Sequence, residues 1–312
     1  MTIEVVHPLD SEALELFASK GQQPGTALAQ AGNANCVKVR RVIQILRDLA
    51  EPAGDKLRIL DLACGEGVYA IEAALRGAEV LALDARTERM GEGARTARRL
   101  GLVNLRFEQS DVRAVNVASH GQFDVIFFLG ILYHLDVPDV FSVLENVRAM
   151  CRQMVIIDTH VCLTPRTRVE HDGRVYEGCE YREHGEHDPD AVRRSRLLAS
   201  LDNTVSFWFT KKSLVDLLRA TGFTSVLECY VPFEPLKPQD RVTLVAMKGT
   251  RVRISTYPLI NDKTEDEVER TLRAVHRSGS SQTRTHHVST KGWIRDVVNR
   301  LLRPLGCQII RV

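Results

Sequence analysis

The sequence predicts an α/β protein with a doubly wound, mostly parallel sheet. Two features predict it: short apolar strands alternate with helical segments from residue 57 onward, and a glycine-rich turn joins the first of these strands to a helix. The chain of 312 residues is 44% hydrophobic and 26% charged, which is ordinary for one large or two modest globular domains. This composition excludes a wholly disordered chain and a low-complexity fibre.

Strands and helices alternate regularly through the centre of the chain. Each expected strand is short and apolar, and a helix between two strands allows a parallel crossover. A turn with two prolines separates the last two strands, so we expect those two to lie antiparallel. The expected strands are residues 57–62, 79–83, 105–109, 124–129, 154–158, 225–231 and 241–247, and the expected helices among them are 68–75, 86–100, 138–150 and 211–221.

The segments around this alternation divide the chain further. Residues 1–50 are expected to form a helical cap, with an amphipathic helix over 37–49. Residues 21–35 are rich in Gly, Gln, Ala and Asn, which predicts a loop or mobile lid. The core domain is expected to comprise residues 51–160 and 205–250.

An insertion over residues 161–204 follows the fifth strand and has no clear periodicity. Its stretch 170–190 holds eight acidic residues, two arginines and three histidines, which is a net charge of −6 with neutral histidines. We expect the insertion to cap the substrate pocket. Its charge favours a neutral or cationic substrate and repels phosphates.

The tail, residues 251–312, is polar and charged over much of its length, so we expect it to be partly mobile. Residues 291–305 place apolar side chains at helical spacing with arginines between them, which predicts a short basic amphipathic helix. This helix is expected to pack on its own domain or on a twin subunit of a homo-oligomer. Docking at a membrane surface is the alternative.

The chain has the features of a cytoplasmic protein. It would be peripheral to a membrane if its last helix docks there. Residues 1–10 lack the cationic start and apolar core of a signal peptide, and the longest apolar stretch, 125–133, is far shorter than the roughly 20 residues of a membrane helix. Seven scattered cysteines without a CxxC pair indicate reduced thiols. A net charge of +2 gives no global attraction to nucleic acid.

The glycine-rich turn carries the decisive motif. Gly65, Gly67 and Ala70 fit G-x-G-x-x-A between a strand and a helix, where glycines let the backbone approach a nucleotide closely. Dinucleotide-binding enzymes share this motif, but Asp61 and Glu66 would place two carboxylates beside a pyrophosphate. They attract instead a cofactor with an ammonium, a sulfonium and no phosphate. The motif therefore favours S-adenosylmethionine over NAD.

Further acidic residues follow the next two strands. Asp84 ends the second strand, 19 residues after Gly65, where it can accept both ribose hydroxyls. Asp111 follows the third strand and can accept the adenine amino group, while Val112 offers its backbone amide. Because the carboxyl ends of parallel strands meet at one edge of the sheet, acids after successive strands indicate a single site.

With these motifs, residues 56–248 resemble class I S-adenosylmethionine-dependent methyltransferases. The resemblance rests on Asp61–Gly67, Leu83–Asp84, Ser110–Val112, Phe123–Gly130 and the Thr221–Phe223 turn. It implies a Rossmann-like methyltransferase fold, with seven strands of which the last is antiparallel. It also implies cofactor contacts at Asp61, Ala63, Gly65, Gly67, Asp84, Ala85, Asp111, Val112 and Leu129.

A narrower resemblance concerns Gly130–His134, which is similar to the equivalent segment of tRNA wobble-uridine carboxymethyltransferases. Ser206–Phe209 is loosely similar as well. This resemblance implies carboxy-S-adenosylmethionine as an alternative cofactor and tRNA as an alternative partner. The acidic stretch over 170–190 opposes tRNA, because it would repel phosphates.

Two histidines are expected where the fourth and fifth strands end at the pocket. His134 and His160 can each act as a general base near neutral pH, and each can equally make a structural hydrogen bond. Tyr133 is expected to line the methyl group of the cofactor. Trp208 and Phe207 either roof the acceptor pocket or belong to the core.

The sequence predicts no metal site. Residues 183–188 include two histidines among acids, but Gly185 and Pro189 argue against the regular helix that would bring these side chains together. The predicted activity is methyl transfer from S-adenosylmethionine to oxygen or nitrogen of a small molecule or glycan, by in-line displacement. The alternatives are a tRNA-modifying transferase and a non-catalytic protein that keeps the cofactor fold.

Overall fold

The computed structural model describes residues 27–232, 234 and 237–250, with side chains from residue 36 onward. These residues belong to the first of two compact units of the chain, Met1–Arg251. The predictions for the segment before residue 27 and for the tail lie outside the described residues. So do the predicted amphipathic helix over 291–305 and its membrane or subunit contacts.

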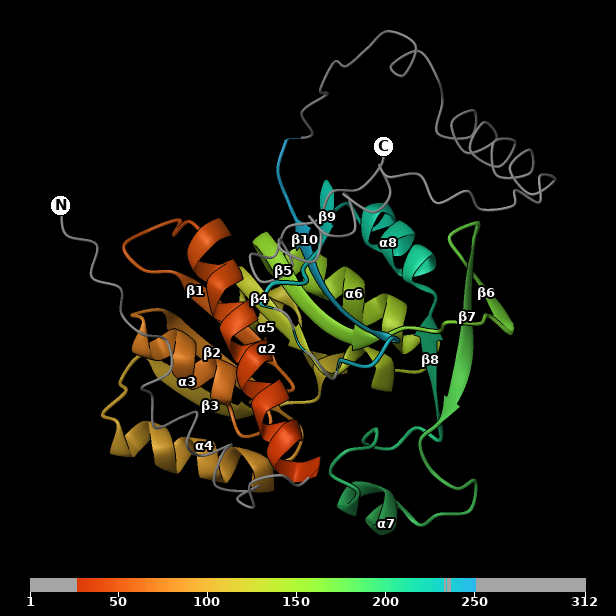
Figure 1. Cartoon of the computed structure of the whole chain (residues 1–312), viewed down its shortest axis with the longest axis horizontal. Coiled ribbons are helices and arrows are strands. Elements are labelled where there is room, and N and C mark those ends of the chain that lie inside the picture. The colour runs from red at the N-terminus through yellow and green to blue at the C-terminus, as the bar shows by residue number, and fades with distance from the viewer. Residues whose placement is uncertain (1–26, 233, 235–236, 251–312) are drawn as a thin grey trace, which may run out of the picture. The chain divides into compact units, whose positions relative to one another are not determined.

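Seven strands form the central sheet, in the order β3-β2-β1-β4-β5-β10-β9 (Figure 1). Strands β1 to β5 pair in parallel, whereas β10 runs antiparallel to both of its neighbours. The predicted doubly wound, mostly parallel sheet is therefore confirmed, including its antiparallel closing strand. The strands are β1 (Arg58–Leu62), β2 (Glu79–Asp84), β3 (Leu105–Gln109), β4 (Phe123–Leu129), β5 (Cys151–His160), β9 (Ser225–Glu228) and β10 (Arg241–Met247).

Helices cover both faces of this sheet and build two apolar cores. Successive strand residues point to opposite faces, so that Ile59 packs with α2 and α3 while Leu60 packs with α6 and α8. Because β4 is buried on both faces, its residues Phe123–Leu129 are almost uninterruptedly apolar. The helices are α2 (Ala27–Leu49), α3 (Val68–Leu75), α4 (Thr87–Arg99), α5 (Val117–His120), α6 (Asp139–Met150) and α8 (Lys211–Ala220), with short 3-10 turns η2 (Val112–Ala114) and η3 (Leu132–His134).

Helix α2 is longer than predicted. It begins at Ala27, so the predicted loop or lid over 21–35 is wrong for residues 27–35. Those nine residues include four alanines, whose helix propensity outweighs the glycine and asparagines that suggested a loop. The second half of the helix is held in the core, where Val39, Val42 and Leu46 are buried.

Two strands of the insertion and one strand directly after it form a second sheet of three antiparallel strands, in the order β6-β7-β8. β6 (Thr167–His171) and β7 (Arg174–Arg182) are a hairpin, and β8 (Val205–Phe209) pairs with β7. The helix α7 (Asp190–Ser195) lies between β7 and β8 in the chain. Asp172 and Gly173 make the two-residue hairpin turn with φ of 48° and 69°, and an Asp-Gly pair is the sequence signal of such a turn.

Two further features bear on the predictions. Among the residues that the structure describes, every helix is too short or too polar to cross a bilayer. The six cysteines within the described residues are free thiols, as the sequence predicted.

Candidate active site

A cavity of about 430 Å³ lies at the carboxyl ends of β1, β2 and β4. Gly67 lies at the start of α3 and is not among its lining residues, and neither is His160. Tyr133 and His134 do line the cavity. The other predicted cofactor residues all line it: Asp61, Ala63, Gly65, Asp84, Ala85, Asp111, Val112 and Leu129.

The loop after β1 turns sharply beneath this cavity. Ala63, Gly65 and Gly67 have positive φ angles of 55°, 57° and 72°. The Gly67 amide donates to the carbonyl of Cys64 at 2.8 Å, just before α3 begins. A Cβ on Gly67 would lie 2.5 Å from the ring of Phe107, so this position requires glycine for space as well as for conformation.

Helix α4 closes against the outside of the same loop. A Cβ on Gly93 would lie 2.2 Å from the carbonyl oxygen of Glu66, so Gly93 allows α4 to pack closely against the loop although the motif does not contain it. Arg89 of the same helix forms an ion pair with Glu66 at 3.0 Å. Because Arg89 compensates the charge of Glu66, the charge argument against a pyrophosphate rests on Asp84, and not on Glu66 as the sequence suggested.

Asp84 is held in place by the backbone on both sides of it. Its Oδ2 accepts the amide of Gly65 at 2.9 Å, and its Oδ1 accepts the amide of Arg86 at 2.8 Å. The residue is only 7% exposed. Each oxygen of a carboxylate can accept more than one hydrogen bond, so the fixed carboxylate can still accept from two hydroxyls. The predicted ribose contact remains a prediction that this geometry permits.

Asp61 is the most unusual group of the cavity. It is 1% exposed, and its Oδ2 has no hydrogen-bond partner among the described residues. Burial, and then the neighbouring charge of Asp84, raise the pKa of Asp61 to about 8. A buried carboxylate oxygen without a donor is costly, and a cationic ligand would relieve that cost. Asp61 therefore fits a ligand with an ammonium group.

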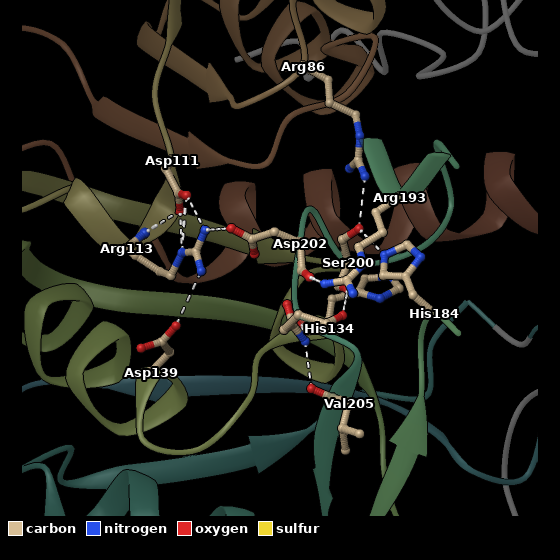
Figure 2. Close-up of polar contacts among 11 residues, drawn as sticks. Arg86, Asp111, Arg113, His134, Asp139, His184, Arg193, Ser200, Asp202 and Val205 are labelled. Atoms are coloured by element: carbon tan, nitrogen blue, oxygen red, sulfur yellow. Dashed lines mark hydrogen bonds and ion pairs between the residues drawn. The ribbon is translucent and has the colours of Figure 1, made fainter. Parts of the chain in front are cut away.

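Asp111 has a partner that the sequence did not suggest. Both of its oxygens accept hydrogen bonds from Arg113, the shortest at 2.6 Å. Arg113 also contacts Asp202 at 2.8 Å and Asp139 at 3.5 Å, so it lies among three acids (Figure 2). Partial burial opposes ionisation, but the hydrogen bonds from Arg113 lower the pKa of Asp111. The predicted contact of Asp111 with an adenine amino group would compete with Arg113.

A segment of the insertion roofs the cavity. Residues 197–203 are among its lining residues. The guanidinium of Arg86 donates to the carbonyls of Ala199 at 3.1 Å and Ser200 at 3.0 Å, and Figure 2 shows the second of these contacts. Asn203 donates to the carbonyl of His134 at 3.1 Å. The roof is thus tied to both sides of the cavity.

The acidic stretch over 170–190 does not line this cavity, which differs from the predicted cap. Most of it forms the β6–β7 hairpin, and the segment that leads to the roof carries Arg193, Arg194 and Arg196 instead. The net charge of −6 is therefore not the charge at the cavity. It carries no argument for a neutral or cationic acceptor, nor against tRNA.

His134 forms a pair with a buried carboxylate. Its Nδ1 lies 2.8 Å from Oε1 of Glu183, whose side chain is 2% exposed. Glu183 also accepts from the Ser206 hydroxyl at 2.9 Å and from the Ser200 amide at 3.0 Å. Burial opposes ionisation, but the hydrogen bond from His134 lowers the pKa of Glu183. An ionised Glu183 requires the proton on Nδ1, which leaves Nε2 as the basic nitrogen.

His160 is held differently. Its Nε2 lies 3.0 Å from a guanidinium nitrogen of Arg241, which can only donate, and its Nδ1 lies 3.1 Å from Asp240. Burial, and then the charge of Arg241, lower the pKa of His160. The lone pair that a general base needs is occupied by Arg241. This geometry favours His134 over His160 as the candidate base.

The remaining aromatic and histidine candidates have structural contacts. Trp208 stacks on Tyr181 with ring centroids 4.6 Å apart and donates to the Tyr133 carbonyl at 2.8 Å, while Phe207 is buried in the core. Neither lines the cavity. His184 is buried between the Ser200 carbonyl and Arg196, whereas His187 is exposed, so these two histidines do not converge on a metal.

The strand order, the glycine loop and the acids at the strand ends together define the class I S-adenosylmethionine-dependent methyltransferase fold. Residues 59–154 match a family described as a methyltransferase domain. Among solved structures, the N-terminal domain of EvdMO1, crystallised with SAH and D-fucose, has a TM-score of 0.53 and 19% identity, over 69% of this chain and 82% of that one. At this identity the likeness concerns the fold.

Curated relatives match part of the chain. A ubiquinone biosynthesis O-methyltransferase of Azotobacter vinelandii is 38% identical over 92 residues, which is 28% of this chain and 37% of the relative. One of Acinetobacter baumannii is 30% identical over 104 residues, which is 33% of this chain and 41% of the relative. The chain spans about two fifths of the length of these relatives. Residues 59–154 thus match a methyltransferase domain, and the described core has the fold of class I S-adenosylmethionine-dependent methyltransferases.

Proposed function

We propose that this protein transfers a methyl group from S-adenosylmethionine to a hydroxyl of a small-molecule acceptor. The observation that carries the proposal is the unpartnered, buried oxygen of Asp61 at the glycine loop, because it calls for a cation where the cofactor's ammonium would lie. The partial relatives are named as O-methyltransferases, which supports oxygen as the accepting atom. A glycan hydroxyl falls within the same chemistry.

The residues present fit this cofactor. In the proposal Asp61 binds its ammonium group and Asp84 binds its ribose hydroxyls, while Val112 offers a backbone amide to the adenine. When bound, S-adenosylmethionine supplies an electrophilic methyl group on a sulfonium. The chain then has two tasks, which are to align the accepting oxygen and to remove its proton.

His134 is the residue that we assign to the proton. It lines the cavity, and with Nδ1–H donated to Glu183 its Nε2 can accept the proton of an acceptor hydroxyl. Glu183 then stabilises the imidazolium that forms, because its carboxylate is buried and already aligned by Ser200 and Ser206. Tyr133, whose ring centroid is 4.2 Å from that of His134, forms the adjacent wall.

The roof over residues 197–203 would exclude water from this end of the cavity. Its contacts with Arg86 and with the His134 carbonyl connect the side of the cavity that would bind the cofactor to the side that holds the proposed base. A water-poor site strengthens the charge interactions of Asp61 and protects the transferred methyl group from hydrolysis.

Calorimetric titration with S-adenosylhomocysteine tests the proposed function. We expect micromolar binding by the full chain, at least about tenfold weaker binding by Asp84→Asn because two charge-assisted hydrogen bonds are lost, and no binding of NAD. The thermal midpoint of the variant, if close to that of the parent, shows that it is folded. Binding of NAD in place of S-adenosylhomocysteine would overturn the proposal.

A further inference from the structure

A second cavity, of about 500 Å³, adjoins the first along the same edge of the sheet. Arg241, the first residue of β10, lines both cavities. Helix α2 contributes Lys38 to the first cavity and Arg41 to the second, and these residues are three positions apart on one face of the helix. A molecule bound in the second cavity would therefore lie next to the first cavity, which we assign to the cofactor.

The second cavity is lined by more cations than anions. Arg41, Lys211, Lys237 and Arg241 line it, against Glu228 and Glu234. Three of the four cations face a carboxylate: Lys211 lies 3.0 Å from Glu228, Arg41 lies 3.4 Å from Glu234, and Arg241 lies 2.6 Å from Asp158. The fourth cation, Lys237, is thus the one whose charge no described carboxylate compensates at ion-pair distance.

Two residues that line this cavity each carry a buried donor without a hydrogen-bond acceptor among the described residues. The Nζ of Lys237 and the Nε of Arg41 are both inaccessible to solvent and make no hydrogen bond within the described part of the chain. The Arg41 side chain as a whole is 1% exposed. Burial, and then the charge of Arg41, lower the pKa of Lys237. Lys237 Nζ also lies 5.8 Å from the centre of the Tyr230 ring, which offers no hydrogen-bond acceptor of ordinary strength. Buried donors normally have partners, so an acceptor from outside the chain would satisfy this pair.

We propose that the second cavity binds a carboxylate group of the methyl acceptor, so that the substrate is a small hydroxy acid. The inference rests on the proposed function, which identifies the bound molecule as the methyl acceptor. One uncompensated ammonium matches a monoanion better than a phosphate dianion, and Arg41 Nε adds a second donor to it. The rest of the acceptor extends past Arg241 toward the first cavity, where the hydroxyl is methylated.

The test compares acids with their neutral amides in the full chain saturated with S-adenosylhomocysteine. Salicylate and lactate are titrated beside salicylamide and lactamide, with inorganic phosphate as a further probe. We expect one or both acids to bind at least about tenfold more tightly than the matching amide. Lys237→Gln should remove that difference, and Lys212→Gln on the surface of α8 should preserve it.

The outcomes separate this inference from the proposed function. Binding of S-adenosylhomocysteine by Lys237→Gln, equal to that of the parent, shows that the variant is folded and that the cofactor site is intact. Equal binding of acid and amide, unchanged acid binding by Lys237→Gln, binding of phosphate alone, or no acid binding overturns the carboxylate site. Loss of S-adenosylhomocysteine binding by the parent chain would instead overturn the proposed function.

Discussion

The two ends of the first cavity are held by contacts that differ in how far apart their residues lie along the chain. At the cofactor end, Asp84 binds the amide of Gly65 and Arg89 binds Glu66, which join residues 19 and 23 positions apart. At the acceptor end, His134 and Glu183 are 49 positions apart, and one belongs to the core while the other belongs to the insertion. The cofactor end thus depends on the common fold, whereas the acceptor end depends on the segment inserted into it.

This difference separates two kinds of variant. Changes at the glycine loop should alter cofactor affinity, because that loop is a single local unit with little room. Changes at the acceptor end should leave cofactor affinity intact and alter turnover. Each experiment below asks whether the two ends behave as separately as their contacts suggest.

The largest effect is expected for His134→Gln. Loss of a general base typically lowers kcat by about 100-fold or more, and binding of S-adenosylhomocysteine should stay within about threefold of the parent. Methyl transfer to the best acceptor found by screening measures the first quantity, and calorimetry measures the second. His160→Gln is the matched control, because Arg241 already occupies its Nε2. If the two variants lose equal activity, the assignment to His134 is wrong.

A smaller effect on turnover is expected for Glu183→Gln. The amide can still accept from His134 but cannot stabilise the imidazolium by charge, so kcat should fall about 10-fold to 100-fold while KM and cofactor affinity change little. Glu180→Gln, on strand β7 just before Glu183 and exposed, is the control and should behave as the parent. A rise in KM with unchanged kcat would indicate that Glu183 only holds the roof.

Substitution of alanine for either of two glycines of α4 should change the free energy of unfolding in opposite directions. Gly93→Ala forces a Cβ against the Glu66 carbonyl and should lower the free energy of unfolding by about 1–3 kcal/mol, with weaker cofactor binding. Gly91→Ala meets only the tip of the Arg95 side chain, at 3.6 Å, and should raise that free energy by about 0.5–1 kcal/mol through helix propensity. Urea denaturation measures both. Equal effects would show that the contact of α4 with the loop is unimportant.

The smallest predicted effect is the release of a proton when the ligand binds. With the pKa of Asp61 raised to about 8, its carboxyl is mostly protonated at pH 7 in the free protein, and an ammonium ligand would ionise it. Binding of S-adenosylhomocysteine should then release up to about one proton, measured by calorimetry in buffers of different ionisation enthalpy. Asp61→Asn should abolish this release. Release that persists in the variant would assign the proton to another group.

The same pKa also predicts a stability trend for the free protein. A carboxyl whose pKa is raised on folding contributes stability that is complete below its unfolded pKa of about 4 and is lost as the pH rises through about 8. Asp61→Asn cannot ionise, so between pH 4 and pH 8 its stability should fall less steeply than that of the parent. Thermal midpoints across this range measure the difference in slope.

Much of the fold follows from local patterns. The strands over 105–109 and 241–247 and the helix over 68–75 have the predicted bounds, because apolar runs and helical spacing are properties of neighbouring residues. The hairpin at Asp172–Gly173 had a local signal too, but its strands are polar on one side and lack the apolar runs of the core strands. The predicted loop failed over residues 27–35, where alanines favour the helix and burial of Val39 and its neighbours holds the second half of α2 in the core.

By itself the sequence determined the sheet, the glycine loop and the acids at the strand ends, since each depends on residues close together in the chain. Only the tertiary structure decided which side chains act as partners. It paired His134 with Glu183, placed Arg241 against His160, paired Glu66 with Arg89 and left Oδ2 of Asp61 without a donor. The physical reason is that charge and protonation depend on what packs around a group, and those neighbours come from segments that are distant in the chain.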